Sequence, residues 1–278
     1  MSLGVDFALQ DDNGTPSFAS AFAWGARFAI LRGVYVAGGV PMIDPTLTTG
    51  AAPARAAGLQ VGAYLALGWQ SDPLAQVATF VAAYGAPQPG DLPPAIDAEA
   101  VSVPPAQALA QLDTAVRALQ RHYRTVMIYT SVNVWSAQLG NAMSTVCGAC
   151  PLWLKVSYPW NAGNPPHPES IPPASPVPAA WQATDTAGAW IEQFQGDAIR
   201  VPGFRSTVDL NSFLNYQASS VDPRTTWVRT TLNAAGFPTG TTDATLASAI
   251  RAFQAAKHLT ADGVVGPVTW AALCATAA

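Results

Sequence analysis

Two carboxyl side chains stand two residues apart in an otherwise apolar stretch. Residues 92–100 read Leu-Pro-Pro-Ala-Ile-Asp-Ala-Glu-Ala, and the proline pair favours an extended backbone that begins a short strand. Side chains at i and i+2 on a strand point to the same face, so Asp97 and Glu99 are expected to lie side by side. Neighbouring carboxylates oppose each other's ionisation, which keeps a proton on one while the other stays ionised. Acid/base chemistry at a glycosidic bond requires this arrangement.

The spacing of the pair does not choose between mechanisms. The Cβ atoms would be roughly 6–7 Å apart, given a rise of about 3.3 Å per residue. Glycosidases with a protein nucleophile hold their carboxyls about 5–5.5 Å apart and inverting enzymes about 6.5–9.5 Å apart, a difference that rotamers can cover. An acidic strand end facing water is the simpler alternative. However, Glu99 is one of only three glutamates in the chain, which disfavours a purely solvating role.

The elements that would position this pair form a repeating pattern. Short β-branched and aromatic runs alternate with alanine-rich helical stretches, as in strand–helix units around a parallel sheet. Strands are expected at residues 4–9, 28–35, 60–67, 92–99, 126–130, 152–158, 190–194 and 207–210, and helices at 18–24, 44–58, 72–84 and 105–123. The predicted fold is α/β, an irregular TIM-like (β/α) barrel with helices on the first five strands, followed by a small all-α three-helix module.

A barrel of this kind would bring distant acids together. Catalytic groups in such barrels lie at the C-terminal ends of the strands. Asp6 falls in the first predicted strand and Asp209 in the last, so both are expected to meet Asp97 and Glu99 in one sugar-sized trough. Residues 159–181 contain eight prolines and are predicted to form a loop on its rim.

Aromatic residues at or just past the predicted strand ends are candidates for stacking on sugar rings. For any single ring, packing in the core is the more common role. The candidates are Tyr64, Trp69, Tyr129, Tyr158, Trp160 and Trp190.

Composition narrows the possible partners. Of the 278 residues, 50% are hydrophobic and 11% are charged, as in a chain that forms a folded core. The net charge of −4 and the lack of a basic stripe argue against a nucleic-acid partner. No apolar run approaches the length of a membrane span, and the start shows no basic and then apolar leader. We therefore expect no membrane insertion and no N-terminal secretory signal.

The cysteines and histidines offer little chemistry. Cys147 and Cys150 have the spacing of a redox or zinc pair, but no second pair or nearby histidine completes four ligands. A loop disulfide or two free thiols is expected there, and Cys274 is expected to pack in the C-terminal helix. The three histidines are scattered, so a Ser/His/Asp or Cys/His site is not expected, and no cofactor is predicted.

Residues 1 to about 215 resemble glycoside hydrolase family 25, the muramidases or lysozymes of bacterial and phage type. The order and spacing of short pieces carry the resemblance: Gly4-Val-Asp-Phe, Phe28-Ala-Ile-Leu-Arg, Val61-Gly-Ala-Tyr, Leu92-Pro-Pro-Ala-Ile-Asp-Ala-Glu, Ile128-Tyr-Thr, Pro151-Leu-Trp-Leu, Val201-Pro-Gly-Phe and Thr207-Val-Asp-Leu-Asn. The resemblance implies hydrolysis of the β-1,4 bond between N-acetylmuramic acid and N-acetylglucosamine, with retention and with assistance from the substrate's acetamido group.

Position by position, the resemblance assigns roles to the acids. Glu99 matches the general acid/base, and Asp97 matches the carboxylate that orients the reacting N-acetyl group or stabilises the developing cation. Asp6 and Asp209 match supporting acids. The expected substrate-binding residues are Tyr64 and Tyr129, which match motif positions, together with Trp69, Tyr158, Trp160 and Gln193.

Three departures from the family pattern concern the substrate subsite. Leu65 and Ala66 follow Tyr64 where His and Phe are usual, and Glu192-Gln-Phe stands for Trp-Gln-Tyr. Lys155 takes a position that is commonly small and neutral. A variant glycan, or weak activity, is therefore an open alternative.

The C-terminal part resembles the three-helix peptidoglycan-binding module of many wall hydrolases. The matching pieces are Val228-Arg-Thr-Thr-Leu-Asn-Ala-Ala-Gly, Ala249-Ile-Arg-Ala-Phe-Gln and Leu259-Thr-Ala-Asp-Gly-Val-Val-Gly-Pro-Val-Thr-Trp-Ala-Ala-Leu. We expect a catalytic barrel at residues 1–215, a linker at 216–225 and the module at 226–278. Residues 239–245 lack the usual Asp-Gly-x-Phe-Gly segment, which would weaken ligand binding and leave the helices intact.

The sequence thus predicts a peptidoglycan hydrolase that its C-terminal module targets to the cell wall, with glycan strands as its partner. Without a leader, it would be made in the cytoplasm and released as a phage endolysin is, or exported by another route. Two alternatives stay open. One is a non-catalytic or altered-specificity protein that binds wall glycans. The other is a metal-dependent hydrolase in which the four acids hold a hard divalent ion.

Overall fold

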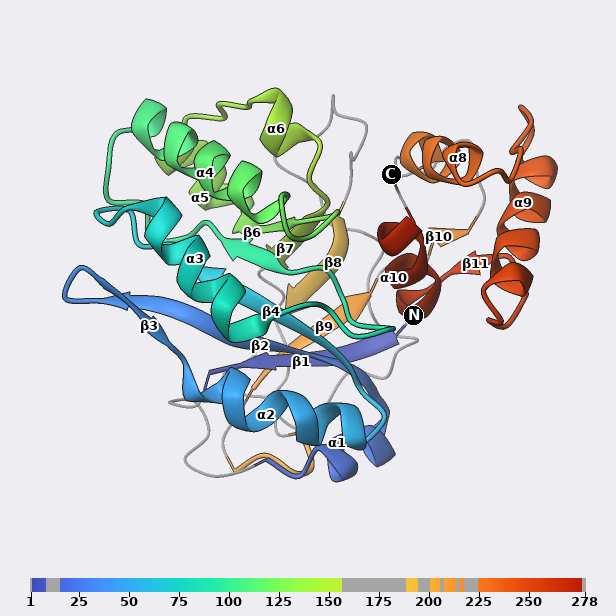
Figure 1. Cartoon of the computed structure of the whole chain (residues 1–278), viewed down its shortest axis with the longest axis horizontal. Helices are drawn as coiled ribbons and strands as arrows, with labels where there is room; N and C mark the ends of the chain where they lie inside the picture. Colours follow the sequence, from blue (N-terminus) through green and yellow to red (C-terminus); the bar gives the residue numbers. More distant parts are fainter. Residues whose placement is uncertain are drawn as a thin grey trace.

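A computed structural model describes residues 2–8, 16–156, 189–194, 201–205, 208–213, 216–217 and 225–276. Eight strands in this part of the chain close into a barrel, with the C-terminal helices at one side (Figure 1). Around the ring they are β1 (Ser2–Phe7), β9 (Asp209–Phe213), β8 (Ala189–Phe194), β7 (Leu152–Val156), β6 (Met127–Ser131), β5 (Ala95–Asp97), β4 (Gln60–Ala66) and β2 (Ala26–Ala37). Pairing of β2 with β1 closes the ring, which confirms the predicted barrel.

The last barrel strand runs against its neighbours, so the prediction of a parallel sheet is wrong for this strand. The other seven are parallel, whereas β9 pairs antiparallel with both β8 and β1. Asp209 is the first residue of β9 and lies directly opposite Asp6. Because β9 is reversed, its first residue reaches the barrel end where the parallel strands finish. Asp209 therefore joins Asp6 at the expected end of the barrel, although it stands at the start of its strand and not at the end.

Helices follow the first five barrel strands, as predicted. They are α1 (Phe18–Trp24), α2 (Pro45–Ala56), α3 (Pro73–Tyr84), α4 (Pro105–Leu119) and α5 (Val132–Leu139), and a short α6 (Thr145–Gly148) precedes β7. The side chains of Asp44 and Asp72 accept the N–H groups of Thr46 and Leu74, and a proline follows each aspartate. These are the capping signals that fix where α2 and α3 begin.

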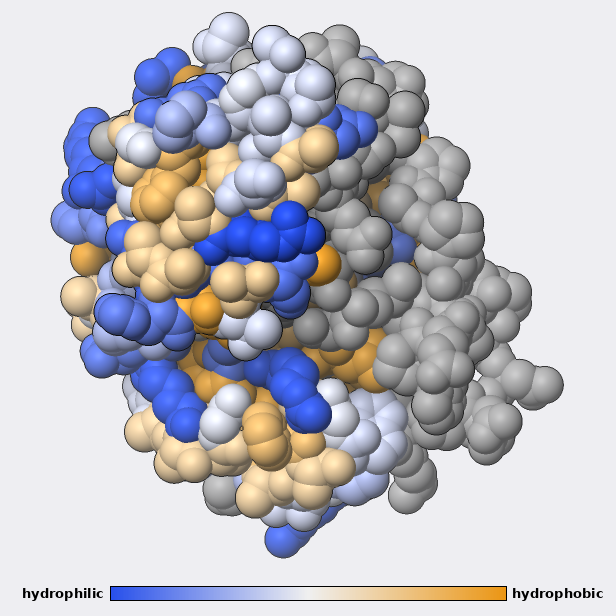
Figure 2. All heavy atoms as spheres, turned by 90° about the vertical axis from the view of Figure 1, so that its right-hand side faces the viewer, coloured by the Kyte–Doolittle hydropathy of each residue, from blue (hydrophilic) through white to orange (hydrophobic). Residues whose placement is uncertain are grey.

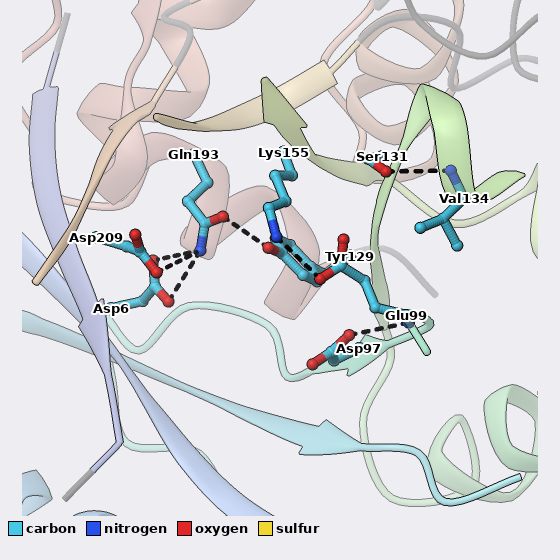
Figure 3. Close-up of polar contacts among 9 residues, drawn as sticks. All are labelled: Asp6, Asp97, Glu99, Tyr129, Ser131, Val134, Lys155, Gln193 and Asp209. Atoms are coloured by element: carbon cyan, nitrogen blue, oxygen red, sulfur yellow. Dashed lines mark hydrogen bonds and ion pairs between the residues drawn. The ribbon is translucent and has the colours of Figure 1, made fainter. Parts of the chain in front are cut away.

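The sequence prediction gives no residue range for several short elements, and two of these adjoin barrel strands. Strand β3 (Val40–Ile43) forms an antiparallel hairpin with the end of β2 through Gly38 and Gly39, both of which have positive φ. Helix α5 begins where β6 ends, and Ser131 caps it by accepting the N–H of Val134 (Figure 3). Neither element has an apolar pattern long enough to be recognised by itself.

Alternation along the strands separates an outer apolar face, packed against the helices, from an inner face with two halves. The inner half away from the acids is apolar and contains Phe28, Ile30, Met127, Trp153, Ile191 and Phe213. At the other end, directly opposed residues of neighbouring strands are polar, and the pairs are Asp6 with Asp209, Asp97 with Tyr129, and Lys155 with Gln193. Packing within the apolar half fixes the positions of the strands that carry the polar side chains.

The C-terminal module packs on the apolar end of the barrel. It consists of α8 (Thr225–Ala234), α9 (Asp243–Ala256) and α10 (Pro267–Thr276), as the three-helix prediction requires. Strand β10 (Tyr216–Gln217), within the segment expected as a linker, pairs with β11 (Val264–Val265) of the module. From the side that carries the module, the described surface mixes hydrophilic and hydrophobic residues (Figure 2).

Aromatic rings join the module to the barrel. The Trp270 ring of α10 lies 4.3 Å from that of Trp190 and 4.8 Å from that of Phe213, measured between centroids. The Trp227 ring of α8 contacts the Trp190 ring edge-on, with the ring centroids 4.8 Å apart. Trp190 is fully buried in this contact, so it is a core residue rather than a ring that could stack on a sugar. The interiors of barrel and module form one continuous hydrophobic cluster.

The cysteines are free thiols, which decides between the two expected states of Cys147 and Cys150. Both are buried, and burial raises the pKa of Cys150 to about 12 and that of Cys147 further. Such thiols are chemically inert at neutral pH. Cys274 is buried in α10, as expected.

One cavity of about 630 Å³ lies between the barrel and the module. It is lined by residues 87–94 and 122–125 and by Lys257, Leu259 and side chains of α10, and none of the four candidate acids borders it. Among the described residues, none of the helices is both long and apolar enough to cross a bilayer.

Candidate active site

Asp6 and Asp209 form the first half of the polar barrel end, and an amide joins them (Figure 3). Gln193 Nε2 donates to Asp6 Oδ1 and Oδ2 at 3.1 and 2.9 Å and to Asp209 Oδ2 at 3.4 Å. Asn211 Nδ2 donates to Asp6 Oδ2 at 2.6 Å, and Trp153 Nε1 donates to Asn211 Oδ1 at 2.8 Å. Asp6 is therefore a fixed, buried carboxylate whose hydrogen bonds order the site.

Asp97 and Glu99 form the second half. Asp97 ends β5, and its Oδ1 accepts the N–H of Glu99 at 3.1 Å, while the Glu99 carbonyl accepts the indole N–H of Trp69 at 2.7 Å. Both carboxyls are partly buried. Ala100 follows with φ of 50°, a left-handed turn that ends the strand. The backbone of Glu99 is thus held on both sides, which limits the positions that its carboxyl can take.

Tyr129 connects the two halves. It lies opposite Asp97 in the pairing of β5 with β6, and its hydroxyl donates to Gln193 Oε1 at 2.6 Å. Burial, followed by the surrounding acids, raises the pKa of Tyr129 well above its usual value, so this hydroxyl keeps its proton. The structure therefore brings all four predicted acids to one end of the barrel (Figure 3).

The environment of Asp97 raises its pKa toward neutral pH. Burial, and then the charge of Glu99, raises the pKa of Asp97 to about 7, although the N–H of Glu99 and the cations Lys155 and Arg32 lower it. A carboxyl that titrates near neutral pH beside a second carboxyl is the arrangement expected for acid/base catalysis. Two neighbouring carboxyls of this kind can supply and receive one proton.

The raised pKa of Asp97 predicts that Asp97→Asn stabilises the fold at pH 8. The folded-state pKa exceeds the unfolded value of about 3.9, so the ionised carboxylate destabilises the fold fully above pH 7, and this cost disappears as pH falls toward 4. We expect the variant to gain about 1–3 kcal/mol at pH 8 and almost nothing at pH 4. Urea unfolding at both pH values measures this, and an equal gain at both would contradict it.

Two cations at this end were not predicted as site residues. Lys155 Nζ lies 3.2 Å from Glu99 Oε2, and Arg32 Nε lies 2.6 Å from Asp44 Oδ2. The Arg32 guanidinium also lies over the Tyr35 ring, 4.9 Å from its centroid. The alternation of side chains along a strand was the sequence signal for both cations. Arg32 is two residues from inward-facing Ile30 and Lys155 is two residues from Trp153, so each cation shares the inward face of its strand.

The predicted substrate-binding residues fall into three groups. Tyr64 is partly exposed and packs edge-on against Trp153, with centroids 6.0 Å apart. Trp69, Tyr129 and Gln193 are buried and hydrogen-bonded within the site, so in this structure they support it rather than offer a free face. Tyr158 and Trp160 lie outside the described residues, as do residues 159–181.

Among the described residues, no three His, Cys, Asp or Glu side chains come together in a way that could hold a metal ion. The space between Asp6 and Asp209 is taken by the Gln193 amide, whose N–H groups are donors and cannot coordinate a cation. Lys155 takes the corresponding position beside Glu99. The donor set therefore does not fit the hard divalent ion of the metal-dependent alternative.

Comparison with family models gives two matches. Residues 9–190 match glycosyl hydrolases family 25, and residues 221–273 match a putative peptidoglycan binding domain. The first match includes Asp97 and Glu99, whereas Asp6, Gln193 and Asp209 lie beyond its ends and are connected to that pair by the fold. No curated protein sequence matches the chain.

Solved structures of similar fold include three lysozymes and muramidases. The bacterial lysozyme from Streptomyces coelicolor has a TM-score of 0.60 at 19% identity, covering 76% of this chain and 91% of that one. The muramidase from Trichobolus zukalii has a TM-score of 0.59 at 24% identity, and the match covers 80% of this chain and 96% of that one. The family GH25 lysozyme from Aspergillus fumigatus has a TM-score of 0.59 at 22% identity, and the match covers 77% of this chain and 93% of that one. At these identities the likeness establishes the fold.

Proposed function

We propose, from the premise that this chain belongs to glycosyl hydrolases family 25, that it is an N-acetylmuramidase in which Glu99 is the general acid/base. Family membership together with the peptidoglycan-binding domain makes the chain a cell-wall glycoside hydrolase. The bond that we assign is the β-1,4 bond between N-acetylmuramic acid and N-acetylglucosamine. The observation that supports this assignment most directly is the carboxyl pair of Asp97 and Glu99 at the polar end of the barrel.

The mechanism that we assign needs no protein nucleophile. Glu99 donates its proton to the glycosidic oxygen as the bond to the anomeric carbon breaks, while the substrate's acetamido oxygen bonds to that carbon. Asp97 accepts the acetamido N–H and stabilises the positive charge that develops on the ring so formed. Glu99 then takes a proton from water as the water oxygen attacks the anomeric carbon, and the bond between that carbon and the acetamido oxygen breaks to regenerate the acetamido group. This restores both carboxyls and retains the configuration.

Asp6 and Asp209 act differently from this pair in the proposal. Each accepts a hydrogen bond from Gln193, and Gln193 in turn accepts the Tyr129 hydroxyl proton in a hydrogen bond beside Asp97. We assign both acids a positioning role, because the carboxylates are already engaged by amides. The negative charge that they contribute also favours a cationic transition state.

Mass analysis of digested peptidoglycan tests the assigned bond. A muramidase releases fragments that end in reducing N-acetylmuramic acid, and these become the corresponding alcohol on borohydride reduction. Fragments that end instead in reducing N-acetylglucosamine would reassign the bond. Peptides released without any new reducing end would contradict glycosidase activity altogether.

A second candidate is a protein that binds wall glycans with little catalysis. It is favoured by one observation, the engagement of Glu99 Oε2 by Lys155 in the unliganded structure. Cosedimentation with insoluble peptidoglycan and no release of reducing sugar over days would support it. Leu65 and Ala66, which follow Tyr64 where the family usually has His and Phe, are compatible with both the muramidase and the glycan-binding function.

The donor geometry predicts that hydrolysis does not depend on a divalent metal. Lysis of purified peptidoglycan should be the same with and without EDTA, because Gln193 and Lys155 occupy the positions that a cation between the acids would need. Turbidity assays after dialysis against chelator, with magnesium or calcium added back, measure this. Activity that is lost in chelator and restored by either ion would favour the metal-dependent alternative.

The domain boundaries and the route to the wall are also proposals. We assign residues 1–215 to the catalytic barrel, 216–225 to the connection and 226–278 to the binding module, which lies close to the family match at 221–273. Release through a membrane lesion, as for a phage endolysin, is the route that we favour. Lysis of cells from outside by added protein, compared with lysis on expression together with a pore-forming protein, would test it.

A further inference from the structure

We propose that Lys155 makes catalysis depend on a carboxylate carried by the substrate near the scissile bond. In the free enzyme Lys155 binds Glu99, and an anionic substituent of the glycan draws the ammonium away and leaves Glu99 able to act on the glycosidic oxygen. This inference rests on the proposed function and adds a specificity determinant to it. It predicts discrimination between glycans that carry carboxylates and neutral glycans with the same linkage.

The ion pair is placed where a substrate can reach it. Lys155 lies on β7 opposite Gln193 and Ser131 of the neighbouring strands, so its side chain points into the polar barrel end. Its Nζ is 3.2 Å from Glu99 Oε2, and the side chains are 29% and 24% exposed. Both groups can therefore exchange partners without unfolding any element.

Stability does not explain this lysine. A partly exposed ion pair contributes little to stability, and the entropy lost on ordering a long lysine side chain offsets much of that contribution. Lys155 also extends from a strand whose neighbours Leu154 and Val156 are buried and apolar. A cation kept at this position beside the proposed general acid is better explained by an effect on substrate binding or on the reaction.

The ion pair conflicts with catalysis as long as it persists. A general acid must present its carboxyl to the glycosidic oxygen, and Oε2 is engaged by the ammonium. Among the described residues, Asp97 also interacts electrostatically with Lys155, and Gln193 already bonds Asp6 and Asp209. A carboxylate on the substrate is a partner for which the ammonium can leave Glu99.

Arg32 does not fill the same role. Its guanidinium is bound to Asp44 at 2.6 Å, and Asp44 also caps α2 through the N–H of Thr46. Moving Arg32 would therefore disturb a helix start as well as an ion pair. Of the two cations described at this barrel end, Arg32 and Lys155, the lysine is the one that can move at low cost.

The required substituent has a defined chemistry and two sources. N-acetylmuramic acid carries an ether-linked lactyl group whose carboxylate is free in peptide-stripped glycans. In peptide-bearing glycans that carboxyl is an amide, and the stem peptide supplies carboxylates instead. A chain of N-acetylglucosamine alone offers the same β-1,4 linkage and the same acetamido group with no carboxylate.

The experiment compares kcat/KM on three glycans: a neutral N-acetylglucosamine oligosaccharide, peptide-stripped peptidoglycan strands and peptide-bearing strands. The enzymes are the wild type, Lys155→Met, Lys155→Arg and the control Arg117→Met, which removes an exposed cation of α4 on the outside of the barrel. We expect the wild type to prefer at least one anionic glycan over the neutral one by at least tenfold. Lys155→Met should reduce this preference to within about twofold, and Lys155→Arg and Arg117→Met should keep it.

The two anionic glycans identify the source of the carboxylate. A preference for stripped strands indicates the lactyl group, and a preference for peptide-bearing strands indicates the stem peptide. The pH profile gives a second readout. Lys155, like Arg32, lowers the pKa of Asp97, which Glu99 raises, and Asp97 must be ionised to accept the acetamido N–H. Loss of Lys155 should therefore move the acidic limb of kcat/KM to higher pH, with Tyr129, Asp6 and Asp209 at the same barrel end unchanged.

Two results separate the possible failures. If Lys155→Met cuts the glycans with the wild-type preference, or if the wild type shows no preference, the inference is overturned while the proposed function stands. If the folded wild type cuts none of the three glycans, the proposed function fails, and this inference fails with it. Melting curves establish that each variant is folded, and Lys155→Arg still tests the proposal if Lys155→Met is not.

Discussion

Glu99→Gln should lower the rate of peptidoglycan hydrolysis by about 10²–10⁴-fold, the usual contribution of a general acid/base. The amide fills the same space but can neither give a proton to the leaving oxygen nor take one from water. The substitution also removes the charge that Lys155 binds at 3.2 Å, so the ammonium is free to contact substrate without restoring activity. Release of reducing sugar from purified walls measures the effect.

The control for Glu99→Gln is Asp72→Asn, which makes the same change from acid to amide at the N-cap of α3, where the carboxyl accepts the N–H of Leu74. Asparagine caps helices as well as aspartate does, so activity and stability should both be kept. Both variants should still sediment with peptidoglycan through the C-terminal module. Wild-type hydrolysis by Glu99→Gln would remove this residue from the mechanism, and loss of folding would show as a lower melting temperature.

Trp270→Ala should destabilise the whole chain by about 3–5 kcal/mol, as large-to-small changes of a buried aromatic do. Trp270 is fully buried and contacts Trp190 and Phe213, which belong to the barrel, so the lost packing is shared between the two parts. We therefore expect barrel and module to unfold in one transition in the wild type, and this transition to move to lower temperature in the variant. Calorimetry with loss of hydrolytic activity as a second probe measures it.

Val268→Ala is the matched control on the same helix, because Val268 is 49% exposed and its truncation should cost less than about 0.5 kcal/mol. Two separate calorimetric transitions in the wild type, with only the smaller one shifted by Trp270→Ala, would show that the module folds independently of the barrel. In that case the ring contacts would contribute little to the stability of the catalytic part.

Much of the fold could be predicted because local signals and periodicity agree there. Aspartate followed by proline marks the starts of α2 and α3, and the apolar spacing of Leu112, Val116 and Leu119 marks α4. The direction of β9 could not be predicted, because a short strand has the same pattern read either way. Only its pairing with β1 and β8 shows that Asp209 arrives from the start of a strand.

The candidate site was predicted as a set of acids and not as a network. Asp6, Asp97, Glu99 and Asp209 could be placed by strand position, since alternation and barrel closure bring them to one end. Their partners depend on tertiary contacts between residues far apart in sequence. The bond from Tyr129 to Gln193 and the ion pair of Lys155 with Glu99 are of this kind. Charged residues at inward strand positions were the signal that would have identified Arg32 and Lys155.

Strand β9 also fixes the distance between the acid cluster and the module. Asp209 at its start belongs to the acid cluster and Phe213 at its end contacts the module, so roughly 13 Å of rigid strand separates them. An enzyme built this way keeps its binding module and its acids at a constant separation, so the two parts reach the cell wall as one rigid unit.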